Sequence, residues 1–128
     1  MYITINIKSE KPIYQQIYDS IIAGIVSGEL REGTILPSAR QLSASLGVNF
    51  HTVNKAYNLL KNDGFLILDR KKEFAVQKKT GENTDFVNRW KEEEKKLINE
   101  ALANGLSDNE IITFFKSILS ADKKGENK

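Results

Sequence analysis

The sequence predicts a mostly α-helical fold with a small β-hairpin, and three observations between Leu36 and Val76 carry this prediction. Two short helical patterns follow one another with only a tight turn between them. Two short apolar segments with a basic middle come directly after the second pattern. A short helix, a tight turn, a second helix and a basic hairpin are, in that order, the parts of a winged helix-turn-helix, which places its second helix in a DNA groove.

The region before these motifs predicts a short strand and then a core helix. Residues 2–7 alternate apolar and polar side chains, as a strand does, and they lack the basic start and continuous apolar run of a signal peptide. Pro12 suits the first position of a helix, and Gly28 suits its end. Gly24 inside this helix indicates close packing by a neighbour. We expect a core-facing apolar stripe at Ile13, Ile17, Ile21 and Ile25.

The first helix of the helix-turn-helix should begin just after Pro37, because a residue before proline is biased away from the helical region. Ser38 fits the N-cap, and Gln41 three positions later completes a capping box. Gly47 supplies the left-handed residue that ends the helix. Leu42 and Leu46 lie between these signals on one face, which we expect to be buried.

The second helix should begin after Asn49, which can cap it, and end at Asn62-Asp63-Gly64. Apolar residues recur at i, i+3, i+4 and i+7, namely Val53, Ala56, Tyr57 and Leu60. The first turn and the opposite face are polar, with Asn49, His51, Thr52, Asn54, Lys55 and Asn58. Asparagine can pair with adenine, and a threonine methyl can contact thymine, so this face suits base reading. The alternative is a face that is polar only because it is solvated.

Two short apolar segments, Phe65–Leu68 and Phe74–Gln77, predict the strands of a β-wing. Between them lie three consecutive cations, Arg70, Lys71 and Lys72. Cations at a hairpin tip suit contact with phosphates or with the minor groove. The alternative is a charged loop that only keeps the surface soluble.

These motifs, in unbroken order over about residues 10–77, resemble those of the GntR family of bacterial transcription regulators. The resemblance is carried by Pro12–Ile17, Ser27–Leu30, Leu36–Leu42, Leu46–Asn49, Thr52-Val53, Ala56-Tyr57 and Asp63–Phe65. It implies that Arg40 contacts DNA from the first helix of the motif, and that the start of the second helix and the wing tip contact it too. The expected DNA-binding residues are Ser38, Arg40, Asn49, His51, Thr52, Asn54, Lys55, Arg70 and Lys71.

The resemblance has one departure and one further implication. Family wings usually carry glycines that allow a turn with positive φ, and this wing has none between Arg70 and Val76. Phe50 is also unusual at the start of a groove-facing helix, where it could contact a thymine methyl or the protein.

The segment after residue 80 is too short for the large effector domains of most members. It therefore resembles the YtrA-type subfamily, which implies a compact two-helix dimerisation module.

The C-terminal part predicts two amphipathic helices separated by Asn104-Gly105, and Ser107 with Glu110 forms a capping box for the second. We expect a DNA-binding domain at residues 1–79, a dimerisation module at 80–121 and a disordered tail at 122–128. The expected dimerisation residues are Phe86, Trp90, Leu97, Ile111, Phe114, Phe115 and Ile118. Pairing two copies would bury them and supply two-fold symmetry, although the helices could instead fold back on their own wing domain.

Together, the motifs and the resemblance predict a homodimer that binds double-stranded DNA at a pseudo-palindromic operator. Repression is implied by the family alone. A dimer seam leaves room for a small-molecule effector. The alternative is a winged helix that binds protein or RNA without reading an operator. Residues 1–80 hold 11 Lys and Arg against 7 Asp and Glu, whereas residues 81–128 hold 8 against 10, so the basic excess lies in the proposed DNA-binding part.

Composition argues against other classes. The chain has one histidine and no cysteine, and no phosphate-binding loop, dinucleotide fingerprint or nucleophile elbow, so we expect no enzyme, cofactor or metal site. No apolar run approaches the roughly 20 residues that cross a membrane. The absence of cysteine fits a reducing cytoplasm, which is the expected location.

Overall fold

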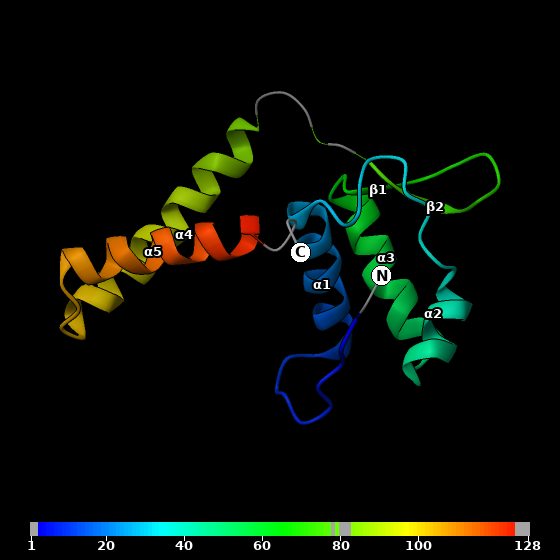
Figure 1. Ribbon diagram of the computed structural model, residues 1–128, viewed down its shortest axis with the longest axis horizontal. Coiled ribbons are helices and arrows are strands. Elements are labelled where there is room, and N and C mark those ends of the chain that lie inside the picture. The colour runs from blue at the N-terminus through cyan, green and yellow to red at the C-terminus, as the bar shows by residue number, and fades with distance from the viewer. Residues whose placement is uncertain (1–2, 78, 80–82, 125–128) are drawn as a thin grey trace. The chain divides into compact units, whose positions relative to one another are not determined.

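The computed structural model describes residues 3–77, 79 and 83–124, with side chains described as far as residue 121. The chain divides into two compact units, Met1–Lys79 and Thr80–Lys128. The helices and strands, labelled in Figure 1, are α1 (Ile13–Ser27), α2 (Ala39–Leu46), α3 (Phe50–Asn62), β1 (Leu66–Leu68), β2 (Phe74–Val76), α4 (Thr84–Ala103) and α5 (Asp108–Lys124). The predicted fold class, mostly α with a small β-wing, is confirmed.

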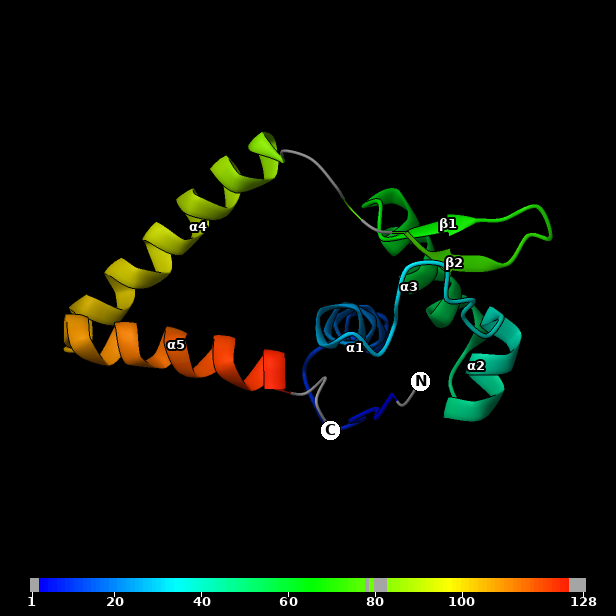
Figure 2. The same cartoon turned by 45° about the horizontal axis from the view of Figure 1, so that its top comes forward.

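Helix α3 is the centre of the first unit, and it packs against α1, α2 and β1. All four of its predicted apolar positions are buried. They join a core whose fully enclosed members are Ile17, Ile21, Val53, Ala56, Tyr57 and Leu60. The β-hairpin projects from this core, with its tip pointing away from α1 (Figure 2).

Hydrogen bonds and backbone angles confirm the predicted helix ends around the turn of the helix-turn-helix. The Ser38 hydroxyl accepts a hydrogen bond from the Gln41 N–H at 3.1 Å, and the Gln41 side chain accepts one from the Ser38 N–H at 3.0 Å. Gly47 ends α2 with a φ of 71°, a conformation that costs glycine little. The Asn49 side chain then accepts from the His51 N–H at 2.8 Å, which starts α3. The tight turn between the two helices is therefore fixed by local chemistry.

Gly24 is packed as closely as its position inside a helix indicated. The Leu30 N–H donates to the Gly24 carbonyl at 2.9 Å, so the chain after α1 folds back against this residue. A Cβ at Gly24 would lie 2.7 Å from the Leu30 Cδ1, which is too close for a real contact. Leu30 itself is buried. Glycine here lets the loop after α1 close over the helix.

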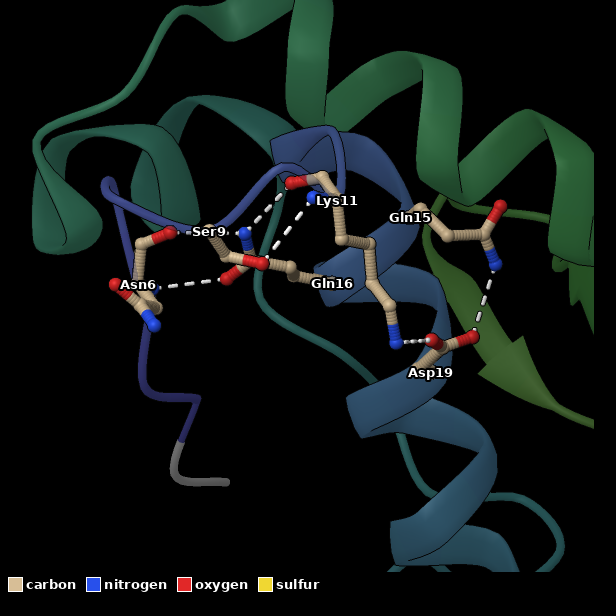
Figure 3. Close-up of polar contacts among 6 residues, drawn as sticks. All are labelled: Asn6, Ser9, Lys11, Gln15, Gln16 and Asp19. Carbon is tan, nitrogen blue, oxygen red and sulfur yellow. Dashed lines mark hydrogen bonds and ion pairs between the residues drawn. The ribbon is translucent and has the colours of Figure 1, made fainter.

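The predicted N-terminal strand is wrong for the part of it that the structure describes. Residues 3–7 form no strand, because no second strand lies beside them to pair with their backbone. The Gln16 side chain pairs with Asn6 instead: its oxygen accepts from the Asn6 N–H at 2.8 Å, and its nitrogen donates to the Asn6 carbonyl at 3.0 Å (Figure 3). Ile3 and Ile5 pack against the core cluster. A single side-chain amide therefore anchors this segment to α1.

The two wing strands pair antiparallel, with Leu66 opposite Val76 and Leu68 opposite Phe74. Each is one residue shorter than predicted, although the Gln77 N–H still donates to the Phe65 carbonyl at 2.9 Å. Ile35 adds an isolated bridge to Ala75. The hairpin is thus held at its base by the segment that leads into α2.

The second unit is a helical hairpin of α4 and α5. Ser107 and Glu110 form the predicted capping box at the start of α5, with bonds of 3.0 and 3.1 Å. Helix α5 continues to Lys124, whereas the tail was expected to begin at residue 122. No helix breaker precedes Gly125, so nothing local stops the helix earlier. Residues 125–128 of the expected tail lie outside the described residues.

No helix in the described part of the chain combines the length and the apolar character needed to span a bilayer.

Candidate nucleic-acid interface

The first turn of α3 presents a positive helix end with polar side chains around it. Asn49 and His51 are exposed, whereas Thr52 and Asn54 are half-buried. No acidic side chain lies in this first turn. The partial positive charge of the helix terminus is therefore not offset by a carboxylate of its own first turn, and such an end attracts phosphate. The turn can hold an anion while the exposed His51 ring and the amide nitrogen of the cap residue Asn49 can face bases.

Two tyrosine hydroxyls, on the buried Tyr57 and the half-buried Tyr18, hold α3 in place through partners that no sequence pattern indicated. The Tyr57 hydroxyl donates to the Pro37 carbonyl at 2.7 Å, which ties α3 to the segment just before α2. The Tyr18 hydroxyl donates to the Asp63 carboxylate at 2.6 Å, which ties α1 to the end of α3. Burial raises the pKa of both phenols, and the bond to Asp63 raises that of Tyr18 further. Both hydroxyls therefore remain donors at neutral pH.

Arg40 and Ser38 lie at the start of α2. The Arg40 side chain is exposed, and its guanidinium carbon lies 4.9 Å from the centre of the Phe50 ring. Ser38 uses its oxygen to accept the capping bond, so its hydroxyl hydrogen remains able to donate. This contact links the start of α2 to the start of α3, because Phe50 is the first residue of α3.

Lys55 lies one turn further along α3, over a different aromatic ring. Its amine nitrogen is 3.9 Å from the centre of the Tyr14 ring, on α1. That distance is well within the range of a cation–π interaction. Lys55 remains exposed, so its amine can still reach an anion. Two of the expected DNA-binding cations therefore rest on aromatic rings of the protein.

The wing turn contains no glycine, and its conformation depends on Asp69 and Lys72 instead. The Asp69 carboxylate accepts from the N–H groups of Lys71 and Glu73, each at 2.9 Å, and the Lys72 N–H donates to the Asp69 carbonyl at 3.0 Å. Lys72 takes the positive φ, 64°, that a glycine would usually supply. Arg70 and Lys71 are exposed on this ordered turn.

A groove of about 540 Å³ lies beside the turn between α2 and α3. Two expected DNA-binding residues, Asn49 and Thr52, line it together with the N-terminal segment that Gln16 anchors. No sequence pattern indicates this neighbourhood, because residues 3–7 are far along the chain from α3. The remaining candidate pair, Arg70 and Lys71, lies in the turn between β1 and β2. This turn is the tip of the projecting hairpin (Figure 2).

The second unit carries the other candidate residues, and most of them face solvent. Phe86 is 50% exposed, Trp90 51%, Leu97 57% and Phe114 63%. Phe115 and Ile118 are less exposed, and Ile111 is half-buried. A groove of about 240 Å³ lies between α4 and α5, lined by Glu94, Leu97, Ile98, Leu106, Ile111, Phe114 and Phe115. The hairpin therefore leaves large apolar side chains uncovered within its own unit.

Among the described residues, no three His, Cys, Asp or Glu side chains gather closely enough to hold a metal ion. The chemistry available at the interface is hydrogen bonding, positive charge and apolar contact.

Comparison with known proteins agrees with this geometry. Residues 13–76, half of the chain, match the family described as bacterial regulatory proteins, gntR family. The chain belongs to the GntR family. The HTH-type transcriptional repressor YtrA of Bacillus subtilis is 32% identical over 128 residues, which cover 98% of each protein. The HTH-type transcriptional regulator Rv1152 of Mycobacterium tuberculosis is 36% identical over 61 residues, and the chain spans about half the length of that relative.

The chain is also similar to solved structures, one of which covers nearly its whole length. YtrA from Sulfolobus acidocaldarius, a GntR-family transcription factor, is 40% identical with a TM-score of 0.65, covering 79% of this chain and 97% of that one. A transcriptional antiterminator from Listeria monocytogenes EGD-e is 29% identical with a TM-score of 0.86, covering 95% and 92%. The DNA-binding domain of AraR, solved in complex with its operator ORX1, is 27% identical with a TM-score of 0.50, covering 57% and 90%.

Proposed function

We propose that this GntR-family chain is a sequence-specific DNA-binding regulator in the cytoplasm. It binds a pseudo-palindromic operator as a homodimer and represses transcription by occluding the DNA. The observation that carries the proposal is the exposed, polar first turn of α3, which has no acidic side chain and lies beside Arg40. Recognition helices read bases through their N-terminal residues, because that end points into the major groove.

Each group at this interface has a chemical part in the proposal. Arg40 offers a bidentate pair to guanine, and Asn54 offers one to adenine. The Thr52 methyl suits contact with a thymine methyl. His51 and the cap residue Asn49 supply further donors at the helix start, while Ser38 and Lys55 suit phosphate contacts. These roles follow from residue type and position on the described surface.

The wing supplies the second point of attachment. Arg70 and Lys71 are exposed on a turn that Asp69 holds with hydrogen bonds, so they project as an ordered pair of cations. Ordered cations bind phosphates, or a narrow minor groove, at a lower entropic cost than mobile ones. The wing thus positions the protein on the duplex, whereas α3 reads it.

The homodimer is supported by the apolar surface of α4 and α5. Large apolar side chains that stay about half exposed within a unit are typical of an interface. Two copies related by a two-fold axis would also present two copies of α3 to two half-sites about one helical turn apart. Repression is supported by the name of the B. subtilis relative, a transcriptional repressor. The dimer seam, including the groove between α4 and α5, is where we would place any small-molecule effector.

The test of this proposal is selection of bound duplexes from a random DNA pool at physiological salt, followed by sequencing. We expect an inverted repeat, bound with an affinity that falls steeply as salt rises, because phosphate contacts release counterions. Recovery of no sequence above background would overturn operator-specific reading. Recovery of a single half-site without a repeat would overturn the dimer on DNA.

Arg40 gives the sharpest single-residue test. Arg40→Ala should make the free energy of specific binding less favourable by about 1–3 kcal/mol if the side chain pairs with guanine. Arg31→Ala is the matched control, because Arg31 is also an exposed arginine and lies outside the proposed interface. Equal affinities for wild type and Arg40→Ala, measured by titration of a labelled operator, would remove Arg40 from the interface.

A second candidate function is a winged helix that binds RNA or protein. The observation that favours keeping it is the name of the Listeria neighbour, a transcriptional antiterminator. Competition separates the two functions. An RNA of the selected sequence should fail to displace the DNA duplex if the protein reads DNA, and it should compete fully if RNA is the true ligand.

A further inference from the structure

Phe50 occupies an unusual place at the candidate interface. It is the first residue of α3, and its half-buried ring packs against the core cluster on one side. Toward the outer surface, the Arg40 guanidinium lies over the ring at 4.9 Å, and the His51 ring meets it at 5.4 Å with an interplanar angle of 70°. One ring therefore contacts a side chain from α2 and one from α3, both of them exposed.

The two contacts have favourable geometry for aromatic interactions. A guanidinium within about 6 Å of a ring centre is attracted by the negative face of the ring. Two rings about 5 Å apart and near perpendicular form an edge-to-face pair. Because Phe50 is anchored by the core, its ring gives each neighbour a fixed surface to rest on.

A fixed surface matters because an arginine side chain has many rotamers. An exposed arginine that is free in solution loses this freedom when it pairs with a base, and the loss weakens binding. An arginine already held over a ring loses less, and its planar fork is presented in one orientation. The same reasoning applies to His51, whose ring has two orientations that present different nitrogens.

We propose that Phe50 is a positioning residue for DNA reading: it holds Arg40 from α2 and His51 from α3 as one prearranged pair. The inference rests on the proposed function, because it assigns Phe50 a part in reading DNA. It goes further by coupling two helices of the motif through a residue that need not touch a base. Base preferences at the positions read by Arg40 and His51 should therefore change together when the ring is removed.

The first test needs no DNA. In the full-length protein, NMR should show the side-chain protons of Arg40 shifted upfield by the ring current of Phe50. Phe50→Leu keeps an apolar side chain but removes the ring, and it should abolish that shift. Tyr14→Leu is the matched control, because it removes the ring under Lys55 and should leave the Arg40 signals unchanged. Arg40 signals that are the same in wild type and Phe50→Leu would overturn the contact.

The second test is a double-mutant cycle on the selected operator. Phe50→Leu should weaken specific binding about twofold to fivefold, the range expected for a cation–π contact at an exposed site. In an Arg40→Ala background the same change should have a smaller effect, limited to what the positioning of His51 contributes, since the Arg40 side chain that Phe50 positions is gone. Phe50→Tyr keeps the ring and should bind like wild type. Effects of Phe50→Leu that simply add to those of Arg40→Ala would overturn positioning and favour direct contact with a base.

A general loss of stability is separated from positioning by two measurements. Thermal unfolding of each variant reports folding, and binding to an unrelated duplex reports the phosphate contacts alone. Positioning predicts that specific binding falls while non-specific binding is unchanged. A parallel fall of both would overturn it. If wild type shows the ring-current shift but selects no duplex, the proposed function fails, and the role of Phe50 in DNA reading fails with it.

Discussion

The two units of this protein differ in how completely they bury their apolar side chains. In the first, Ile17, Ile21 and Leu60 have no exposed surface, and the core continues through all three helices into the wing. In the second, α4 has no buried residue, and Leu97 and Phe114 are more than half exposed. Apolar residues recur with a similar helical period in the two units, yet only the first unit buries them.

This difference separates two tasks. The first unit holds the candidate DNA-reading groups on a closed core, so their geometry does not depend on a partner. The second unit has an exposed apolar face, and contact with a partner would stabilise this unit by removing that face from water. We therefore expect the stability of the first unit to be independent of protein concentration, and that of the second to depend on it.

The largest effect should come from disrupting the proposed dimer interface on α4 and α5. Phe114→Glu places a charge in the apolar face, and we expect monomers that bind the operator about 10²–10⁴-fold more weakly, because two linked half-site contacts become one. Phe115→Glu should act in the same way. Molecular mass by analytical ultracentrifugation and operator titration check both results.

The matched control is Thr113→Glu, which adds the same charge to the opposite face of α5. It should remain dimeric and bind normally. A dimer mass that persists in Phe114→Glu and Phe115→Glu would refute the dimer face and leave a fold-back on the wing domain as the alternative.

The next largest effect contrasts the two regions directly. Ile21→Ala removes a fully enclosed side chain and should lower the free energy of unfolding of the first unit by about 2–5 kcal/mol. Leu97→Ala should cost far less in a dilute monomeric sample and more as concentration rises. Denaturant unfolding of the full chain over a range of concentrations measures both. An Ile21→Ala cost that changes with concentration would contradict the self-contained first unit.

A smaller effect should follow from Tyr57→Phe. The Pro37 carbonyl would lose its donor, and loss of this partly buried hydrogen bond should cost about 0.5–1.5 kcal/mol of the free energy of unfolding. Tyr14→Phe is the control, because the Tyr14 hydroxyl has no hydrogen-bond partner among the described residues, and it should cost under about 0.5 kcal/mol. Equal unfolding midpoints for the two variants would show that the bond to Pro37 does not hold α3.

The smallest effect should be a pH dependence at the start of α5. The Ser107 N–H lowers the pKa of Glu110 below its ordinary value of 4.5, so the folded state favours the ionised carboxyl. This contribution is fully present above pH 4.5 and is lost as pH falls through the lower folded pKa. Helicity of the second unit should therefore decline at acid pH less steeply in Glu110→Gln than in wild type. Identical pH profiles would contradict the capping bond, and Glu93→Gln, outside the cap, serves as the control.

Local signals explain why so much of the first unit could be predicted. The capping box at Ser38 and Gln41 spans three positions, and the buried positions of α3 follow from one helical period. The prediction failed at residues 3–7, where alternation implied a strand but no neighbouring strand exists. A strand depends on a partner elsewhere in the chain, so a pattern in one segment does not decide it.

Long-range partners explain what the sequence did not reveal about the candidate interface. Tyr57 meets Pro37 across 20 positions, and Tyr18 meets Asp63 across 45. The ring under Lys55 belongs to a different helix, and nothing in the sequence of α3 identifies it. The sequence did not indicate the conformation of the wing turn, because that turn lacks glycine. In the structure, Lys72 has the positive φ.

By itself, the sequence determined the order of the helices and of the two wing strands, the capped helix ends around the turn between α2 and α3, and the polar character of the turn that starts α3, because each depends on residues within a few positions of one another. Only the tertiary structure decided that Arg40 and His51 share the Phe50 ring, that Gln16 anchors the N-terminal segment, and that apolar stripes of similar periodicity are enclosed in one unit and exposed in the other. Burial and contact depend on what the rest of the chain places nearby, and no local pattern contains that information.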